Sequence, residues 1–232
     1  MRNNLLNRLN IKRYKNYQAN KKFDNVIFIW IPKTAGTSLM ATIEKQCLVQ
    51  EYLEVDKIRR HFPNVGFSTF GHISIPSLLT DQIISKEYYN SSKTFCICRN
   101  PYDRFISLFH YSKKVNRIPE DTTMHQFVSL IKNGIHDIGL YNVKKLSQCN
   151  PQVAWVKDVR VDKVFKFEEI ILDQNPVFDF LGLKREPLVH NNQSKERKTY
   201  QEELDKETIS FIESFYHEDF DHFNYSKELS VE

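Results

Sequence analysis

A run of six apolar residues that leads into a lysine-containing loop of small residues places the strongest constraint on the fold. The segment VIFIWI spans residues 26–31, and PKTAGTS follows it at residues 32–38. Near-continuous apolar composition is typical of a parallel strand that is covered on both faces. We therefore expect a buried strand that ends just before Lys33, with a helix beginning at about Thr37 or Ser38. Open α/β sheets bind ligands at this carboxyl edge.

Two more strands are predicted farther along the chain, at residues 94–98 (TFCIC) and 161–167 (VDKVFKF). Segments long enough for helices separate the three strands, and consecutive parallel strands need crossover connections of this length. No internal repeat and no Pro/Gly/Ser-rich linker divides the sequence. We therefore predict an α/β fold with a single domain over residues 23–232, in which helices flank a central, mainly parallel sheet.

Two helix starts are marked by an asparagine followed by a proline, as is typical of an N-cap and a first helical position. Asn100 and Pro101 open one predicted helix, and Asn175 and Pro176 open another that Gly182 should end. A last helix is expected near the C-terminus, packed on the sheet. Its apolar face would consist of Ile209, Ile212, Tyr216 and Phe220.

Positive charge is concentrated at the N-terminus. The net charge is +4, but residues 1–22 alone carry seven basic side chains and no acidic one, which leaves −3 for residues 23–232. We therefore do not expect the domain to bind nucleic acid, and any anion must be held by local geometry. Residues 1–22 are expected to form a basic, partly disordered arm, and weak contact with a membrane surface is the alternative.

Hydropathy and cysteine usage favour a cytoplasmic protein. No window approaches the roughly 18 apolar residues that a membrane span needs, and the N-terminus lacks the apolar core of a signal peptide. The chain has four cysteines, without a C-x-x-C pair or histidines at finger-like spacing. We therefore expect reduced core thiols and no zinc site.

The loop from Pro32 to Ser38 has the composition of an anion site. Its small residues allow backbone N–H groups to turn toward a ligand, and the following helix N-terminus adds the positive end of a dipole. The loop is not a Walker A motif, because there the lysine follows the second glycine, whereas Lys33 precedes Gly36. No magnesium-binding carboxylate motif follows the second strand. Both observations disfavour a nucleotide-dependent kinase, and a kinase with an atypical phosphate loop is kept as an alternative interpretation.

Several motifs together resemble the sulfotransferases that use 3′-phosphoadenosine 5′-phosphosulfate (PAPS). IPKTAGTS resembles their 5′-phosphosulfate loop, and CRNPYDRFISLFHY (98–111) resembles their 3′-phosphate motif. Between them, FSTFGHISI (67–75) supplies a Gly-His pair as in the carbohydrate sulfotransferases, including the heparan sulfate 2-O-sulfotransferase branch. NPQVAWV, VDKVFKFEEI and EDFDHFNY add further likeness, so that the resemblance covers most of residues 24–225.

This resemblance implies a P-loop-like three-layer fold and a role for each motif residue. Lys33 would stabilise the leaving group, and His72 would act as the base that accepts the proton of the attacking hydroxyl. Arg99 and Ser107 would bind the 3′-phosphate. The phosphosulfate would be bound by Lys33, by the backbone of Thr34, Ala35, Gly36, Thr37 and Ser38, and by the hydroxyls of Thr37 and Ser38. No metal is required, because the lysine supplies the counter-charge.

The expected acceptor is a hydroxyl of a carbohydrate or a glycolipid, and the expected protein is a bacterial, cytoplasmic member of the family without a membrane anchor. The loops at 113–121 and 133–141 are candidates for contacting the acceptor. In the 2-O branch a second histidine precedes the glycine, where this chain has Phe70. Glu168 is expected to form hydrogen bonds at a strand end. A non-catalytic module that binds the nucleotide is a further alternative.

Overall fold

The computed structural model describes residues 24–47, 49–51, 66–134, 146–187 and 203–227. The predicted N-terminal arm at residues 1–22 lies outside this part of the chain, as do residues 135–141 of the second candidate acceptor loop. Within the described ranges, no helix is both long and apolar enough to cross a membrane.

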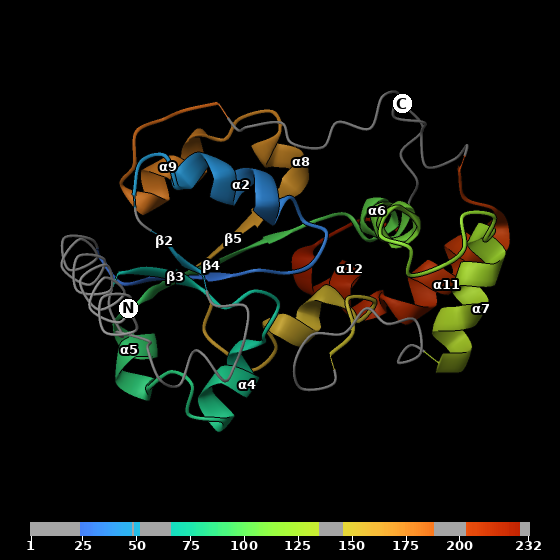
Figure 1. The fold of residues 1–232 in the computed structure, drawn as a ribbon, viewed down its shortest axis with the longest axis horizontal. Helices are drawn as coiled ribbons and strands as arrows, with labels where there is room; N and C mark the ends of the chain where they lie inside the picture. Colours follow the sequence, from blue (N-terminus) through green and yellow to red (C-terminus); the bar gives the residue numbers. More distant parts are fainter. Residues whose placement is uncertain (1–23, 48, 52–65, 135–145, 188–202, 228–232) are drawn as a thin grey trace, which may run out of the picture.

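A five-stranded parallel sheet forms the centre of the molecule, in the order β2-β3-β1-β4-β5 (Figure 1). Helices α2, α8 and α9 cover one face, while α4 and α5 lie on the other. This arrangement confirms the predicted three-layer α/β fold. The strands are β1 (Val26–Ile29), β2 (Val49–Glu51), β3 (Phe67–Thr69), β4 (Lys93–Cys98) and β5 (Lys163–Lys166).

The helices lie in two groups, around the sheet and beyond its carboxyl edge. Those around the sheet are α2 (Gly36–Ile43), α4 (Ile75–Thr80), α5 (Lys86–Ser91), α8 (Phe167–Ile170) and α9 (Asn175–Leu181). Those beyond the edge are α6 (Pro101–Lys114), α7 (Met124–Gly134), α11 (Lys206–Phe215) and α12 (His217–Phe223). A short 3₁₀ helix, η2 (Gln152–Trp155), contacts α12.

The predicted helix starts are confirmed in one case and corrected in two. Asn100 caps α6, because its side-chain oxygen accepts a hydrogen bond from the Tyr102 amide at 3.0 Å. Helix α2 begins at Gly36, slightly earlier than predicted. Asn175 is the first residue of α9 and not its cap, because the cap position is held by Gln174. The Asn175 amide donates to the Asp173 carboxylate at 2.9 Å. Gly182 ends α9 in the left-handed conformation, as predicted.

The C-terminal segment differs from the prediction of one helix lying on the sheet. It forms two helices, α11 and α12, which meet at Tyr216. Helix α11 packs against α6 and α7 beyond the carboxyl edge of the sheet, where Phe211 and Ile212 join the aromatic side chains of α6. The apolar face was therefore identified, but its partner is a helical layer and not the sheet.

The core consists of three groups of buried side chains. The upper cluster lies between the sheet and α2, α8 and α9, the lower cluster lies under the opposite face, and the helical cluster lies between α6, α7, α11 and α12. All four cysteines are free and buried, which confirms the expected core thiols: Cys47 in the upper cluster, Cys96 and Cys98 in the lower one and Cys149 in the helical one. Burial raises the pKa of Cys47 to about 11 and that of Cys149 to about 12.

Candidate active site

The loop after β1 has an unusual backbone that depends on close packing. Lys33 and Ala35 both adopt the left-handed conformation, with φ of 67° and 69°. The next residue, Gly36, lies directly against the indole of Trp30, and a Cβ placed on it would fall 2.1 Å from Trp30 Nε1. A side chain at this position would force the indole or the loop to shift, because the ring already occupies the space that it would need.

The N-terminus of α2 offers backbone donors to an anion. The amides of Ser38 and Leu39 both donate to the Ala35 carbonyl, so the amides of Gly36 and Thr37 precede the first intrahelical bonds. Thr37 is exposed and Ser38 is half-buried. Thr34 differs from these, since its hydroxyl is buried and donates to the Ile31 carbonyl at 2.9 Å. The hydroxyl of Thr34 therefore stabilises the loop from inside.

The side chain of Lys33 lies among other positive groups. Its Nζ is 3.9 Å from the centre of the Tyr111 ring on α6. Burial first, and then the neighbouring positive charges of Arg99, Lys114 and Arg104, together lower the pKa of Lys33 to about 8. An anion bound here would reverse this effect, because it would favour the charged form of the lysine. The loop is therefore arranged to receive negative charge.

Arg99 connects this loop to the second motif. Strands β1 and β4 are paired in register, Ile29 opposite Cys96, so the residues that follow the two strands meet at one edge of the sheet. The Nη1 of Arg99 lies 3.5 Å from the Lys33 carbonyl, its Nη2 lies 3.6 Å from the Asp103 carboxylate, and its guanidinium stacks 4.5 Å from the centre of the Phe167 ring. The two motifs that the sequence singled out are thus in contact.

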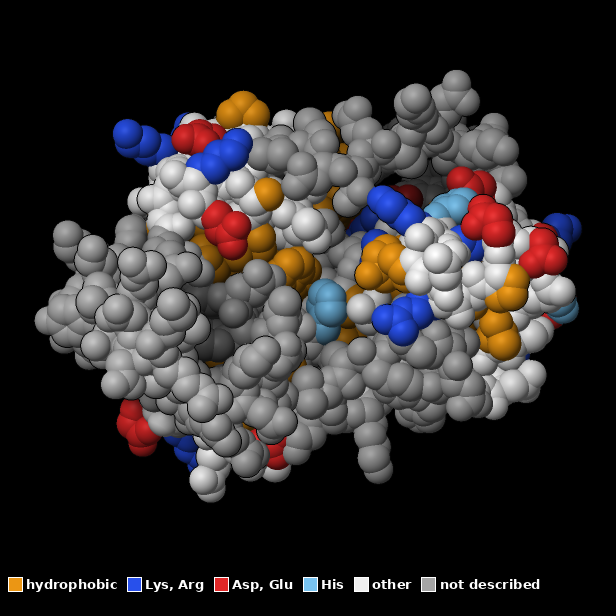
Figure 2. Space-filling model, viewed as in Figure 1, with side chains coloured by type: hydrophobic (Ala, Val, Ile, Leu, Met, Phe, Trp, Pro, Cys, Tyr) orange, Lys and Arg blue, Asp and Glu red, His pale blue; other side chains and the backbone are white. Residues whose placement is uncertain are grey.

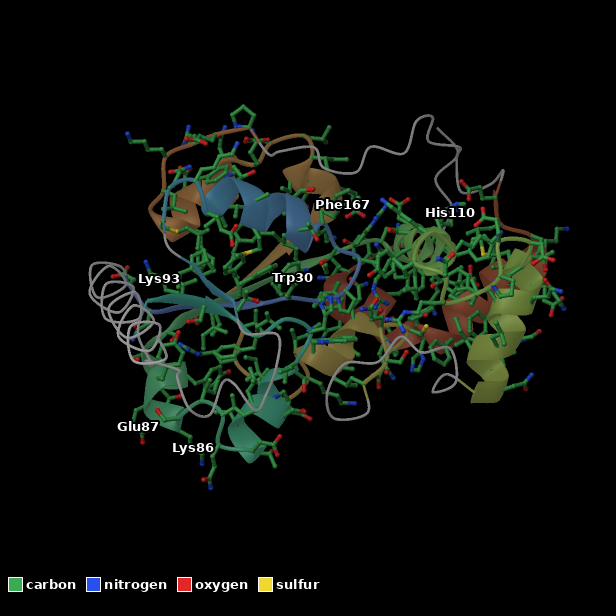
Figure 3. The ribbon with its side chains drawn as sticks, viewed as in Figure 1. Trp30, Lys86, Glu87, Lys93, His110 and Phe167 are labelled. Atoms are coloured by element: carbon green, nitrogen blue, oxygen red, sulfur yellow. The ribbon has the colours of Figure 1, made fainter. Side chains whose placement is uncertain are left out.

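Ser107 lies on the same side of α6 as Tyr111, half-buried. Helical spacing puts Ser107 on one face of α6 with Arg104 and Tyr111, away from the aromatic stripe formed by the buried side chains of Phe105, Leu108 and Phe109. Trp30 and Phe167 lie at the end of the sheet that faces α6 (Figure 3). Figure 2 shows Lys and Arg side chains gathered on the α6 side of this face, beside a histidine near its middle.

His72 follows β3 and is oriented by two hydrogen bonds. Its Nδ1 lies 2.9 Å from the Trp30 carbonyl oxygen, which can only accept, so Nδ1 carries the proton in the neutral ring. Nε2 is then left with a lone pair. The His72 carbonyl accepts a hydrogen bond from Trp155 Nε1 at 2.7 Å. Burial lowers the pKa of His72 from its usual 6.5, and Arg104 and Lys33 act in the same direction, while the bond to Trp30 opposes them.

The sequence reasoning missed Arg104 as a component of the site. Its side chain is only 2% exposed, with Nε donating to the Pro32 carbonyl at 3.0 Å and Nη2 donating to the Gln148 carbonyl at 2.8 Å. Arg104 thereby fixes Pro32, the residue at the start of the loop that contains Lys33. Its helical position next to the aromatic stripe carried no signal that the guanidinium would reach another loop.

Glu168 has the structural role that the sequence predicted. One carboxylate oxygen accepts a hydrogen bond from the Asn100 amide at 2.8 Å, and the other accepts one from the Tyr225 hydroxyl at 2.8 Å. Glu168 therefore fixes the turn that follows β4. Among the residues described by the structure, no group of three or more His, Cys, Asp or Glu side chains could hold a metal ion.

A cavity of about 630 Å³ lies between α7 and the loop that precedes it. It is lined by parts of both candidate acceptor loops, including Pro119, Asp121, Asn133 and Gly134. None of its lining residues belongs to the site around Lys33, Arg99 and His72. The cavity is therefore separate from the candidate site at the carboxyl edge of the sheet.

Known proteins resemble the chain in sequence and in overall fold. A family model described as "Sulfotransferase family" matches residues 19–226. A crystal structure of mouse sulfotransferase SULT7A1 complexed with PAP is similar with a TM-score of 0.59 and 16% sequence identity, over 88% of each chain. A sulfotransferase from Alicyclobacillus acidocaldarius is similar with a TM-score of 0.50 and 17% identity, over 87% of this chain and 98% of that one. No curated protein sequence matches the chain significantly.

Proposed function

The chain belongs to the sulfotransferase family, and we propose that it transfers a sulfuryl group from PAPS to a hydroxyl of a carbohydrate or glycolipid. The contact between the two anion-binding motifs is the observation that carries this proposal. Arg99 Nη1 lies 3.5 Å from the backbone of Lys33, which places the two motifs a short distance apart. A nucleotide with phosphate groups at both ends of its ribose would span them.

We assign the nucleotide contacts as follows. The amides of Gly36 and Thr37, with the hydroxyls of Thr37 and Ser38, would bind the 5′-phosphosulfate at the N-terminus of α2. Arg99 and Ser107 would bind the 3′-phosphate on the side of α6. The hydroxyl of Thr34 is left out of this set, since it is already bonded within the loop. The 3′-phosphate contacts distinguish PAPS from ATP-like ligands.

The proposed reaction needs one base and one positive group. The acceptor oxygen attacks sulfur, the bond from sulfur to the bridging phosphate oxygen breaks, and the acceptor proton passes to Nε2 of His72. The hydrogen bond from Nδ1 to the Trp30 carbonyl holds the ring in the tautomer that this step requires. Lys33 would stabilise the negative charge that develops on the departing oxygen. The products are a sulfate ester and 3′,5′-adenosine bisphosphate.

A carbohydrate or glycolipid acceptor is supported by the position of the histidine. His72 follows Gly71 directly after β3, and β3 is the neighbour of β1 in the sheet, so the base stands beside the lysine loop. The sequence resemblance associates this Gly-His pair with sulfotransferases of carbohydrates. The acceptor itself would approach from the open side of Trp30 and His72.

Calorimetric titration with 3′,5′-adenosine bisphosphate tests the proposed donor. We expect binding without added metal and a much weaker response to 5′-AMP and to magnesium-ATP. Arg99→Ala should remove most of the preference for the bisphosphate, whereas Arg117→Ala, at an exposed position after α6, should not. Equal binding of AMP and the bisphosphate, or a preference for magnesium-ATP, would overturn the assignment.

A further inference from the structure

The backbone of Arg99 is held by a side chain from a distant part of the chain. The Oε1 of Gln152 accepts a hydrogen bond from the Arg99 amide at 2.9 Å, and its Nε2 donates to the Arg99 carbonyl at 2.8 Å. One amide group thus satisfies both backbone groups of a single residue. Gln152 is fully buried in η2, 53 residues farther along the chain.

Gln152 is itself held by a buried carboxylate on α12. One oxygen of Asp219 accepts hydrogen bonds from the Gln152 backbone amide at 2.8 Å and from its Nε2 at 3.4 Å. The other oxygen accepts from the Val153 amide at 2.9 Å. Asp219 is fully buried, so its charge is stabilised by these donors in place of water. The carboxylate therefore fixes both the start of η2 and the direction of the Gln152 amide.

We propose that Gln152, held by Asp219, is a positioning residue that fixes the backbone of Arg99 and so determines the preference for a nucleotide with a 3′-phosphate. This inference rests on the proposed function of Arg99. A guanidinium can form a bidentate contact with phosphate only from a narrow range of positions. The side-chain amide of Gln152 fixes the two peptide groups on either side of the Arg99 Cα, and so it limits where the Arg99 guanidinium can lie. Glu168 holds the next amide in the chain, at Asn100.

A purely structural role for Gln152 predicts a different result. If the Gln152 amide only stabilised the core, its loss would lower the stability of the protein and would weaken the binding of every nucleotide to the same degree. If the amide positions Arg99, its loss would lower the affinity for ligands that carry a 3′-phosphate and leave the affinity for those that lack one unchanged. The ratio of two affinities therefore separates the roles, because a general loss of folded protein cancels from it.

The test measures the dissociation constants of 3′,5′-adenosine bisphosphate and 5′-AMP by calorimetry. Gln152→Met keeps the length of the side chain and removes both bonds to Arg99. We expect the affinity ratio to fall by about tenfold or more, the size expected for a weakened hydrogen bond to a charged group. The affinity for 5′-AMP should stay within about twofold, far below the tenfold change that corresponds to 1.4 kcal/mol.

The chain offers a matched control for this variant. Gln46 holds the backbone of Lys184 in the same way, with its Nε2 donating to the Lys184 carbonyl and its Oε1 accepting from the Lys184 amide, both at 2.8 Å. Gln46→Met removes the same two kinds of hydrogen bond at the end of α2, and we expect it to leave the affinity ratio unchanged.

Gln152→Glu provides a second readout, which also serves if Gln152→Met does not fold. A neutral glutamic acid can accept from the Arg99 amide and donate to the Arg99 carbonyl, whereas the ionised form cannot donate. The affinity ratio of this variant should therefore recover as the pH is lowered, relative to the wild type measured in parallel. A ratio that follows the wild type at every pH would contradict the proposal.

A double-mutant cycle with Arg99→Ala completes the test. If Gln152 acts through Arg99, Gln152→Met should have no further effect on the ratio in the Arg99→Ala background. Persistence of the effect in that background, or an equal loss of both affinities in Gln152→Met, would overturn the inference. A wild-type protein that does not distinguish the two nucleotides would instead refute the proposed function.

Discussion

At the scale of single residues, burial lowers the pKa of two basic side chains, with opposite consequences for catalysis. For His72 the shift takes the pKa below 6.5, so the ring is neutral at pH 7 and can accept a proton. For Lys33 the shift takes the pKa to about 8, so part of the population loses its charge in mildly alkaline solution. If these residues have the proposed roles of base and leaving-group stabiliser, activity should be confined to the pH range between the two pKa values.

We expect the pH profile of kcat/KM for PAPS to be bell-shaped. Activity should be lost as the pH falls through the lowered pKa of His72, where the base becomes protonated. It should also be lost as the pH rises above about 8, where free Lys33 loses its proton. Lys33→Arg should remove the alkaline limb, because arginine keeps its charge. An alkaline limb that stays near 8 in this variant would exclude Lys33 as its source.

His72→Ala should lower kcat by about 10²–10⁴-fold, the usual contribution of a general base. The affinity for 3′,5′-adenosine bisphosphate should stay unchanged, because His72 follows β3 and is not part of either phosphate motif. Steady-state kinetics and calorimetry measure the two quantities separately. His217→Ala, at an exposed position on α12, is the control. Unchanged turnover in His72→Ala would mean that another group accepts the proton.

Single-residue predictions succeeded where the signal was local. Arg99 directly follows β4, whereas β1 ends at Ile29, earlier than predicted, and Lys33 lies in the loop after it. Both strands are apolar runs in the sequence, so the meeting of the two residues at one edge follows from a parallel sheet. The bond between His72 and the Trp30 carbonyl depends on β3 lying beside β1, which no local pattern contains. The same holds for Gln152, whose partner lies 53 residues away.

At the scale of elements, the loop after β1 is shaped by the strand that precedes it. The Trp30 indole stacks with Phe28, with ring centres 5.8 Å apart, and lies directly against Gly36 at the start of α2. The strand end and the helix start are therefore packed on one another with no room for a side chain. The position of the Gly36 and Thr37 amides, which we propose bind the 5′-phosphosulfate, depends on this contact.

Gly36→Ala should weaken the binding of 3′,5′-adenosine bisphosphate, because the added methyl group would force the loop or the Trp30 indole to shift. We expect a loss of about tenfold or more, which corresponds to about 1.4 kcal/mol of binding free energy. Gly182→Ala is the matched control. Gly182 has φ of 66° with nothing within 4 Å of the added Cβ, so this variant should lose about 1 kcal/mol of stability. Its bisphosphate affinity should not change. Calorimetry and thermal unfolding measure the two effects, and wild-type affinity in Gly36→Ala would contradict the argument.

The elements that could be predicted were those that are long enough to show a pattern or that begin with a recognisable cap. Strands β1, β4 and β5 and the start of α6 were found, because apolar runs and an Asn-Pro pair mark them. Strands β2 and β3 have three residues each, too few for a periodic pattern. The partner of α11 could not be predicted, because an apolar helix face carries no information on whether a sheet or other helices cover it.

At the scale of the whole molecule, a layered sheet and a helical cluster meet at the active site. Arg104 belongs to α6 in the helical cluster, yet it donates to the carbonyl of Pro32 in the loop after β1. Asp219 on α12 similarly binds η2, whose Trp155 belongs to the lower cluster. Buried polar contacts thus join the two halves beside the candidate active site.

Arg104→Met should lower the free energy of unfolding by about 2–5 kcal/mol, because two buried carbonyls would lose their charged donor. Arg117→Met, at an exposed position, should change it by no more than about 0.5 kcal/mol. Urea unfolding would be followed by fluorescence, which reports Trp30 and Trp155 on the sheet side, and by circular dichroism, which reports mainly the helices. We expect the two transitions to coincide in the wild type. An unchanged midpoint in Arg104→Met would show that the junction is held elsewhere.

The burial of every thiol makes the protein convenient for covalent labelling. The thiolate is the form that reacts with maleimides and disulfide reagents, and raised pKa values keep the four cysteines protonated at neutral pH. A cysteine introduced at exposed Lys86 (Figure 3) should therefore accept a fluorophore in the folded protein without removal of the native cysteines. The native thiols are distributed over all three core clusters. The rate at which each cysteine is alkylated during unfolding would therefore show when its cluster becomes exposed to solvent.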